Sequence, residues 1–255
     1  MLRTFYSDFR NYLKSTGFKI GVIVIFGYVT FFSVVMALLY RIALHDIVPA
    51  EDVLCSYCDM ATFLITGSTL LMFATDYSNG TIRNKILSGA KRSEIYLSAI
   101  FTGILISLIY SAIAIVFELG FALVLSDGLA ILTVSEEAGI CLQYMISSMA
   151  IGAFSTMLVM VLGGLRISYF AGLVFAFVCN IISSEVADKL YPQEGPVMIT
   201  GARLFLYTAY DRFMPYAHFQ QFQRWPFSSY VIGSAVMIAI SILVGLVIFE
   251  RKEIR

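Results

Sequence analysis

The segment from Ile20 to Tyr40 reads IGVIVIFGYVTFFSVVMALLY and carries no charged side chain. A hydrocarbon layer about 30 Å thick is crossed by roughly 20 apolar residues in a helix. A second uncharged run of similar length extends from Val231 to Phe249. These two segments decide the fold class, because each predicts a helix that crosses a membrane.

The composition of the whole chain agrees with a membrane protein. Hydrophobic residues make up 59% of the 255 positions, charged residues make up 13%, and the mean hydropathy is +0.85. A soluble domain of this length has no core large enough to hide so much apolar surface. Further apolar runs predict six transmembrane helices in a single all-α domain over residues 1–255. The added runs extend from Asp59 or Met60 to Phe73, and cover Ile95–Phe117, Cys141–Leu162 and Ile167–Ile182.

Basic residues are distributed unevenly between the predicted loops. Twelve of the 17 lysines and arginines fall at the two termini and in the second and fourth loops. Because basic residues near span ends are retained on the cytoplasmic side, we predict a multi-pass protein of the cell membrane with both termini in the cytoplasm. The twelve are Arg3, Arg10, Lys14, Lys19, Arg83, Lys85, Lys91, Arg92, Arg166, Arg251, Lys252 and Arg255.

The first 19 residues predict an amphipathic helix on the inner leaflet. Apolar residues recur there at helical spacing and face away from the basic ones, which is typical of a helix lying in the membrane interface. The apolar residues are Leu2, Phe5, Tyr6, Phe9 and Leu13. The pattern fits a simple anchor, and it fits equally a helix that takes part in moving the first span.

The cytoplasmic loop over residues 76–94 predicts a short helix of its own. Asn79 and Gly80 form a turn signal, and Thr81 is placed to cap a helix that follows. Gly89 is placed to end it. A loop that only marked the cytoplasmic side would explain the basic charge but would not require these start and stop signals.

This short helix has an apolar edge beside a basic one. The apolar edge is predicted from Ile82, Ile86 and Leu87, and the basic residues next to it are Arg83 and Lys85. After the loop, Ser93 is predicted as the N-cap of the third span, with Glu94 in the positive first turn of that helix.

In this loop the chain resembles the type 2 ABC exporter permeases. The family's second loop reads as an acidic residue, a Gly-Thr pair, a basic short helix and a basic-Ser step into the third span. The matching residues are Asp76, Gly80, Thr81, Arg83, Lys85, Arg92 and Ser93. The resemblance implies a coupling helix that docks into a cleft of a separate ATPase. The docking residues it implies are Asn79, Gly80, Thr81, Ile82, Arg83, Lys85, Ile86 and Leu87.

The resemblance also implies the partners and the activity. It implies a cytoplasmic ABC ATPase dimer that carries ATP and Mg, a second permease as a homodimer or a sibling subunit, and export of an amphipathic or hydrophobic substrate such as an antimicrobial peptide, a drug or a lipid-like molecule. The chain has no G-x-x-x-x-G-K-S/T loop, so we expect it to bind no cofactor and to be no enzyme by itself. We expect no nucleic-acid partner, and with only two histidines we expect no metal site.

Thr62, Thr66 and Thr69 recur along one side of the second predicted span. Such hydroxyls commonly bond their own helix backbone, and a small, weakly polar stripe can also face a second subunit or line a substrate path. The sequence leaves these alternatives open. It also leaves open whether Cys55 and Cys58 form a disulfide and whether Glu118 has a function.

The connection over residues 183–229 is the longest predicted outside the cell. The resemblance implies short re-entrant helices here. Aromatic residues recur at every third position before the last span, and they include Phe219, Phe222 and Trp225. An aromatic belt at the membrane surface explains this pattern, and an outer gate over the exit path is the alternative.

Two other classes of function are weaker alternatives. A secondary transporter or a channel that uses no ATPase would fit six spans, but the spans lack the broken helices and coupling-ion acids typical of such transporters. An intramembrane enzyme would need paired catalytic groups within the spans. The one Glu-Glu pair, Glu136 and Glu137, falls in a predicted outer loop.

Overall fold

The computed structural model describes residues 2–54, 58–130, 132–163, 165–192, 199–220 and 224–252. These residues form helices joined by short connections, and their one β pairing is an isolated bridge between Val48 and Ser126. The helices are α1 (Leu2–Lys14), α2 (Thr16–Leu39), the π-helical turn η1 (Tyr40–Leu44), α3 (Ala50–Leu54), α4 (Cys58–Ser78), α5 (Thr81–Leu87), α6 (Arg92–Leu125), α7 (Val134–Leu162), α8 (Leu165–Leu190), α9 (Gly201–Phe213), the 3-10 turn η2 (Ala217–Gln220) and α10 (Phe227–Arg251).

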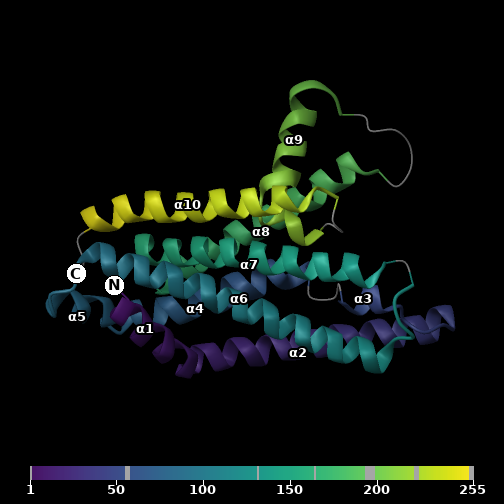
Figure 1. Cartoon of the computed structure of the whole chain (residues 1–255), viewed down its shortest axis with the longest axis horizontal. Coiled ribbons are helices and arrows are strands. Elements are labelled where there is room, and N and C mark those ends of the chain that lie inside the picture. Colours follow the sequence, from purple (N-terminus) through teal and green to yellow (C-terminus); the bar gives the residue numbers. More distant parts are fainter. Residues whose placement is uncertain are drawn as a thin grey trace.

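Within the described ranges, five helices are long and apolar enough to cross a membrane. They cover Thr16–Leu44, Arg92–Leu125, Val134–Leu162, Arg166–Leu190 and Phe227–Arg251. The chain therefore has the helical make-up of a multi-pass membrane protein. The remaining long helix, α4, has 21 residues and runs within the same bundle (Figure 1).

The helices that contain the predicted second and fifth spans extend beyond the predicted span ends. The predicted spans end at Phe73 and Ile182, whereas α4 continues to Ser78 and α8 continues to Leu190. Hydropathy marks where the apolar surface of a helix stops, but backbone hydrogen bonding continues through polar residues until the chain meets a breaker. For α8 the proline at position 192 follows directly after the last turn.

The centre of the bundle is built on α6 and α7. More than half of the most apolar stretch of each is buried, compared with 17% in α2. The two helices approach closely at glycines, because a Cβ atom on Gly152 would lie 2.7 Å from the carbonyl oxygen of Gly103. Close backbone approach at small residues is the usual way that membrane helices pack.

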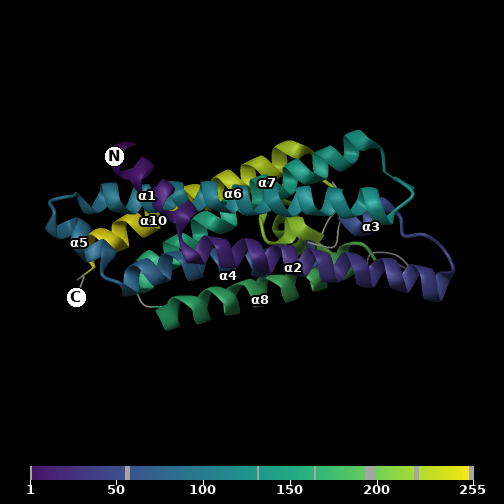
Figure 2. The same ribbon diagram turned by 90° about the horizontal axis from the view of Figure 1, so that it is seen from below.

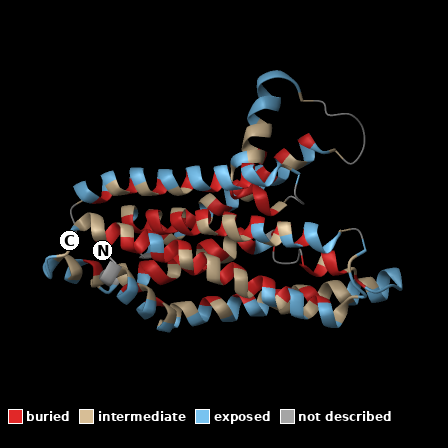
Figure 3. Cartoon of the chain, in the orientation of Figure 1, coloured by how far each residue is buried: buried red, intermediate tan, exposed pale blue. Residues whose placement is uncertain are grey.

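The peripheral helices α2, α8 and α10 have long exposed apolar sides. Ile23, Phe31, Phe170 and Leu243 are each exposed by 65% or more of their surface. Figure 3 shows the buried residues gathered on the central helices, and Figure 2 shows α8 along the outer side of α4. Apolar side chains on the outer surface fit helices that contact lipid rather than water.

The two ends of the bundle carry opposite charge. Helix α5, helix α1 and the last turn of α10 meet at one end (Figure 1), where the guanidinium of Arg92 donates to the carbonyl oxygens of Glu250 and Lys252, at 3.0 and 2.7 Å. The other end holds α3 and the connections that follow α2 and α6. We call the end with α1, α5 and the last turn of α10 the basic end, because lysines and arginines gather there. We call the end with α3 the acidic end, because it carries carboxylates. The acidic end carries Asp46, Glu51, Asp52, Asp127, Glu136 and Glu137.

The connection between α8 and α10 is arranged differently from the predicted short re-entrant helices. Helix α9 projects sideways from the bundle instead of turning back into it (Figure 1). The part that packs into the bundle is the single turn η2, in which Ala217, His218 and Phe219 are buried. The amphipathic segment at the N-terminus is also shorter than residues 1–19, because α1 ends at Lys14 and Ser15 caps α2 by accepting a hydrogen bond from the Phe18 amide.

Candidate functional site

Helix α5 at the basic end is bracketed by two glycines in left-handed conformations. Gly80 has φ 71° and immediately precedes the helix, and Gly89 has φ 90° and follows its C-cap. The amide of Gly89 donates to the carbonyl of Ile86 at 3.0 Å. The prediction of Gly89 as the stop is confirmed, but Thr81 does not cap the helix: it is the first helical residue, and Gly80 occupies the N-cap position without a side-chain hydrogen bond.

The faces of α5 differ from the predicted apolar edge. Ile82 is buried and Ile86 packs against the core, whereas Leu87 is 74% exposed. At about 100° per residue, positions 82, 85 and 86 share a face and positions 83 and 87 share the opposite one. Leu87 therefore belongs with the exposed Arg83, and the assignment of Leu87 to the buried edge is wrong.

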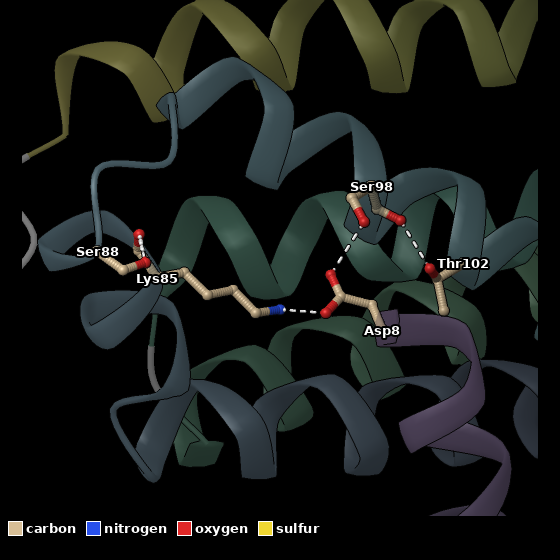
Figure 4. Close-up of polar contacts among 5 residues, drawn as sticks. All are labelled: Asp8, Lys85, Ser88, Ser98 and Thr102. Atoms are coloured by element: carbon tan, nitrogen blue, oxygen red, sulfur yellow. Dashed lines mark hydrogen bonds and ion pairs between the residues drawn. The ribbon is translucent and has the colours of Figure 1, made fainter. Parts of the chain in front are cut away.

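The inner face of α5 is tied to α1 by an ion pair. The Nζ atom of Lys85 lies 2.7 Å from Oδ1 of Asp8, and the side chains are 24% and 9% exposed. The other carboxylate oxygen of Asp8 accepts a hydrogen bond from the Ser98 hydroxyl of α6 at 3.0 Å (Figure 4). Asp8 thus joins α1, α5 and α6 through one buried carboxylate, and we call this set the Asp8 latch.

Neighbouring contacts hold the latch in place. The Ser88 hydroxyl donates to the carbonyl of Lys85 at 2.8 Å, and the Thr102 hydroxyl donates to the carbonyl of Ser98 at 2.7 Å (Figure 4). The first bond closes the last turn of α5, and the second satisfies a hydroxyl within α6. These bonds fix the backbone from which Lys85 and Ser98 reach Asp8.

Helix α1 is also anchored to the end of α4. The ring of Tyr12 lies 4.8 Å from the ring of Phe73, centre to centre. Burial raises the pKa of the Tyr12 phenol well above its ordinary value. The nearby carboxylate of Asp76, which accepts a hydrogen bond from the phenol, raises this pKa further. Tyr12 therefore remains a neutral hydrogen-bond donor.

The start of α6 differs from the prediction by two residues. Lys91 is the N-cap and makes no side-chain cap bond, so Ser93 lies inside the first turn and does not cap it. Glu94 is in that first turn, as predicted. Arg92 binds the end of α10, whereas Arg83 and Lys91 of the same loop are exposed.

The site divides into an anchored face and a free face. Lys85, Ile82 and Ile86 hold α5 on the bundle, while Asn79, Arg83, Asn84 and Leu87 are exposed. A short helix held in this way cannot tilt without acting on α1 and α6 through Asp8. The arrangement can therefore pass a push on the exposed face into α1 and α6.

The predicted threonine stripe lies inside this chain's own bundle. Thr62, Thr66 and Thr69 are at most 1% exposed. The Thr66 hydroxyl lies 3.5 Å from the hydroxyl of Tyr216, and the Thr69 hydroxyl lies 3.3 Å from that of Ser107. The stripe therefore does not form a surface for a second subunit in this conformation, and a role in a substrate path stays a prediction.

The predicted outer aromatics have separate environments. Phe219 is 2% exposed and stacks on Tyr144 with ring centres 5.2 Å apart, so it is a core residue and not part of a surface belt. The indole nitrogen of Trp225 donates to the carboxylate of Asp211 at 2.9 Å. Phe222 lies outside the described residues, and its part in a gate stays a prediction.

The buried His218 holds the connection between α8 and α10 against α7. No role for this histidine was predicted from the sequence. His218 is fully buried, its Nδ1 lies 2.7 Å from the Ser147 hydroxyl, and its carbonyl accepts from the Gln143 side chain at 2.7 Å. Burial lowers the pKa of His218 to about 4. The one signal in the sequence is that Gln143 and Ser147 lie four positions apart, on the same side of α7.

Three further expectations concern Glu118, the cysteine pair and metal binding. Glu118 is 2% exposed on α6. Cys55 lies outside the described residues, so the structure does not address its pairing with Cys58. In the part of the chain that is described, no group of three or more histidine, cysteine or acidic side chains is placed to hold a metal ion.

A scan against models of known protein families found no match for this sequence, and a search of curated proteins found no similar chain.

Proposed function

We propose that this chain is the membrane-spanning permease subunit of an ATP-driven exporter, and that a separate cytoplasmic ABC ATPase docks on the exposed face of α5. ATP and Mg would be bound by that ATPase, and a second permease, identical or related, would complete the transport path. Both termini would lie in the cytoplasm of a cell-membrane protein.

The two-faced α5 is the observation that supports this proposal most directly. A loop that only oriented the protein would need basic residues but no folded docking element. Here the helix presents Arg83 and a 74% exposed Leu87 outward, while its inner face is fastened to α1 and α6. An exposed apolar residue beside a basic one, on a rigid support, is a suitable anchor for a protein partner.

The proposal includes six transmembrane spans, namely the five long apolar helices and, in addition, α4. The hydrogen bonds from Arg92 bring the end of α10 beside the start of α6, at the same end as α1. A chain that begins and ends at one side of a membrane must cross it an even number of times, and five long apolar helices require one more. Helix α4 has 21 residues, which span about 31 Å at 1.5 Å per residue, close to the hydrocarbon thickness.

The proposed cargo is an amphipathic or hydrophobic molecule, such as an antimicrobial peptide, a drug or a lipid-like compound, moved outward. The bundle interior supports this choice, because it is lined by aliphatic and aromatic side chains and hydroxyls such as those of Thr62 and Ser155. Such a lining suits an apolar molecule better than a small ion.

Co-purification tests the docking. The full-length chain carrying Arg83→Glu and Leu87→Ala should lose a co-purifying ATPase that the unaltered chain retains. Lys91→Glu is the matched control, because Lys91 is an exposed basic residue at the same end but outside α5. ATP hydrolysis in the eluate and mass spectrometry would identify the partner. Unchanged recovery with the double variant would refute the docking assignment.

A further inference from the structure

A large apolar cavity lies at the acidic end of the bundle, between α3, α6 and α7. Its volume is about 840 Å³, and most of its wall is aliphatic. Leu54 contributes from α3, Ile115 and Leu119 from α6, and Leu142 from α7. Cavities of roughly 300–1,000 Å³ with apolar walls and a few polar groups are typical of small-molecule sites.

The carboxylate of Glu137 lines this cavity, and one of its oxygen atoms has no hydrogen-bond partner among the described residues. Glu137 is 6% exposed, and its Oε2 atom makes no hydrogen bond to any described residue. Its neighbour Glu136 is different, because it is exposed and closes a capping box with Thr133 at the start of α7. The helix start is therefore already capped without Glu137.

The charge around Glu137 is also negative. Asp127 lines the same cavity, and Glu51 is close enough to Glu137 to interact with it electrostatically. Glu51 is itself held in place, because its Oε1 atom accepts hydrogen bonds from the amides of Ala130 and Leu132, at 2.7 and 2.9 Å. The acidic side of the cavity therefore draws on α3, on the connection between α6 and α7, and on α7 itself.

A buried carboxylate in an apolar wall is stabilised by a positive charge, and it repels an anion. Because most of the wall is aliphatic, the ligand also needs an apolar body, which an inorganic cation lacks. We propose that this cavity binds hydrophobic cations, with Glu137 as the counter-charge. The inference deepens the proposed function, on which it rests, by naming the class of cargo: an apolar molecule with a localised positive charge.

The test compares two ions of the same shape and opposite charge. Tetraphenylphosphonium and tetraphenylborate would be titrated by equilibrium dialysis against the full-length chain in lipid nanodiscs, with empty nanodiscs subtracted as background. We expect saturable binding of tetraphenylphosphonium alone. Glu137→Gln should weaken that binding at least tenfold, because the substitution keeps the shape of the side chain and removes its charge.

Glu136→Gln is the matched control. It removes one negative charge from the same turn, and glutamine can still complete the capping box, so binding should stay within twofold. Leu119→Trp is a second variant, which should block binding by filling the cavity while the helical circular dichroism is unchanged. Equal binding of both ions, or equal weakening by the two glutamine variants, would overturn the proposal.

The binding measurement needs no ATPase, so its result is independent of the docking test. Tetraphenylphosphonium binding that depends on Glu137 would support the site even if the α5 variants retained their partner. Loss of the partner without charge-selective binding would leave the exporter proposal standing and remove the cation site.

Discussion

The Asp8 latch makes a quantitative prediction about coupling between α1 and α5. Replacing Lys85 by methionine would leave the carboxylate of Asp8, 9% exposed, with only the Ser98 hydroxyl as a partner. Breaking a fully buried pair in this way costs roughly 3–5 kcal/mol. The Lys85 side chain is 24% exposed, so water can reach it and the pair is only partly buried. We therefore expect Lys85→Met to reduce the stability by about 2 kcal/mol.

The same pair can be isolated by a double-mutant cycle. Asp8→Asn removes the charge but keeps an acceptor for Ser98, so it should cost about 1 kcal/mol. In the double variant neither charge is left unpaired, so the total loss should fall short of the sum by about 1–2 kcal/mol. Arg83→Met is the control, because Arg83 is exposed on the opposite face and makes no hydrogen bond or ion pair to another described residue.

Hydrogen exchange followed by mass spectrometry measures the coupling between Asp8 and Lys85 directly. Peptides over residues 2–14 and 81–90 report local opening of the two helices in the full-length chain in nanodiscs. A loss of about 2 kcal/mol corresponds to roughly thirtyfold faster exchange in both peptides. Additive effects, with a coupling below about 0.3 kcal/mol, would refute the assignment of Asp8 as the joint between α1 and α5.

Three further predictions concern the outer connection and the core. His218 has a native pKa of about 4 against about 6.5 when unfolded, so the unfolded chain binds the extra proton, and roughly 3 kcal/mol of stability should be lost as the pH falls from 6.5 to 4. Thermal unfolding of His218→Asn should show a flatter pH profile, and an identical profile would contradict this. Gly152→Ala should destabilise by about 1–3 kcal/mol, since its Cβ would lie 2.7 Å from a backbone oxygen of α6, whereas Gly27→Ala, with open space around it, should be neutral or slightly stabilising. Trp225→Phe removes a donor to the buried Asp211 and should cost about 1–3 kcal/mol by thermal unfolding; equal stability would show that this bond contributes nothing.

The sequence predicted the class of fold well, because its dominant signal is the apolar run. The uncharged segments Ile20–Tyr40 and Val231–Phe249 both fall within long helices. Element ends were less predictable. Asp76 and Lys189 are polar and were placed outside the spans, but both continue their helices, because backbone bonding does not depend on the polarity of the side chain.

The candidate site was found in the sequence, but its internal geometry was not. The turn at Asn79–Gly80 and the stop at Gly89 follow from local backbone preference, which a single sequence carries. The role of Lys85 depends on Asp8, 77 positions away, and no local pattern connects the two. Lys85 was therefore grouped with Arg83 as a basic residue of a predicted cytoplasmic loop, although the fold turns its side chain toward Asp8.

The outer connection shows the same limit. Phe219 and Trp225 are six positions apart, and with Phe222 between them they follow a spacing of three, which suggested one surface. Phe219 lies in η2, whereas Trp225 lies in the connection between η2 and α10, so the two rings do not share a helix face. His218 was overlooked because its partners Gln143 and Ser147 are on α7, far away in the sequence.

The measurement that tests the central claim most directly is photo-crosslinking from the exposed face of α5 in cells. Benzoylphenylalanine at Leu87, 74% exposed at the basic end, should crosslink the chain to a polypeptide that is labelled by a photoreactive ATP analogue. The same group at Leu123, 86% exposed at the acidic end, should give no such product. If Leu87 yields no ATP-binding partner, or if Leu123 yields the same one, α5 is not the docking site of an ATPase.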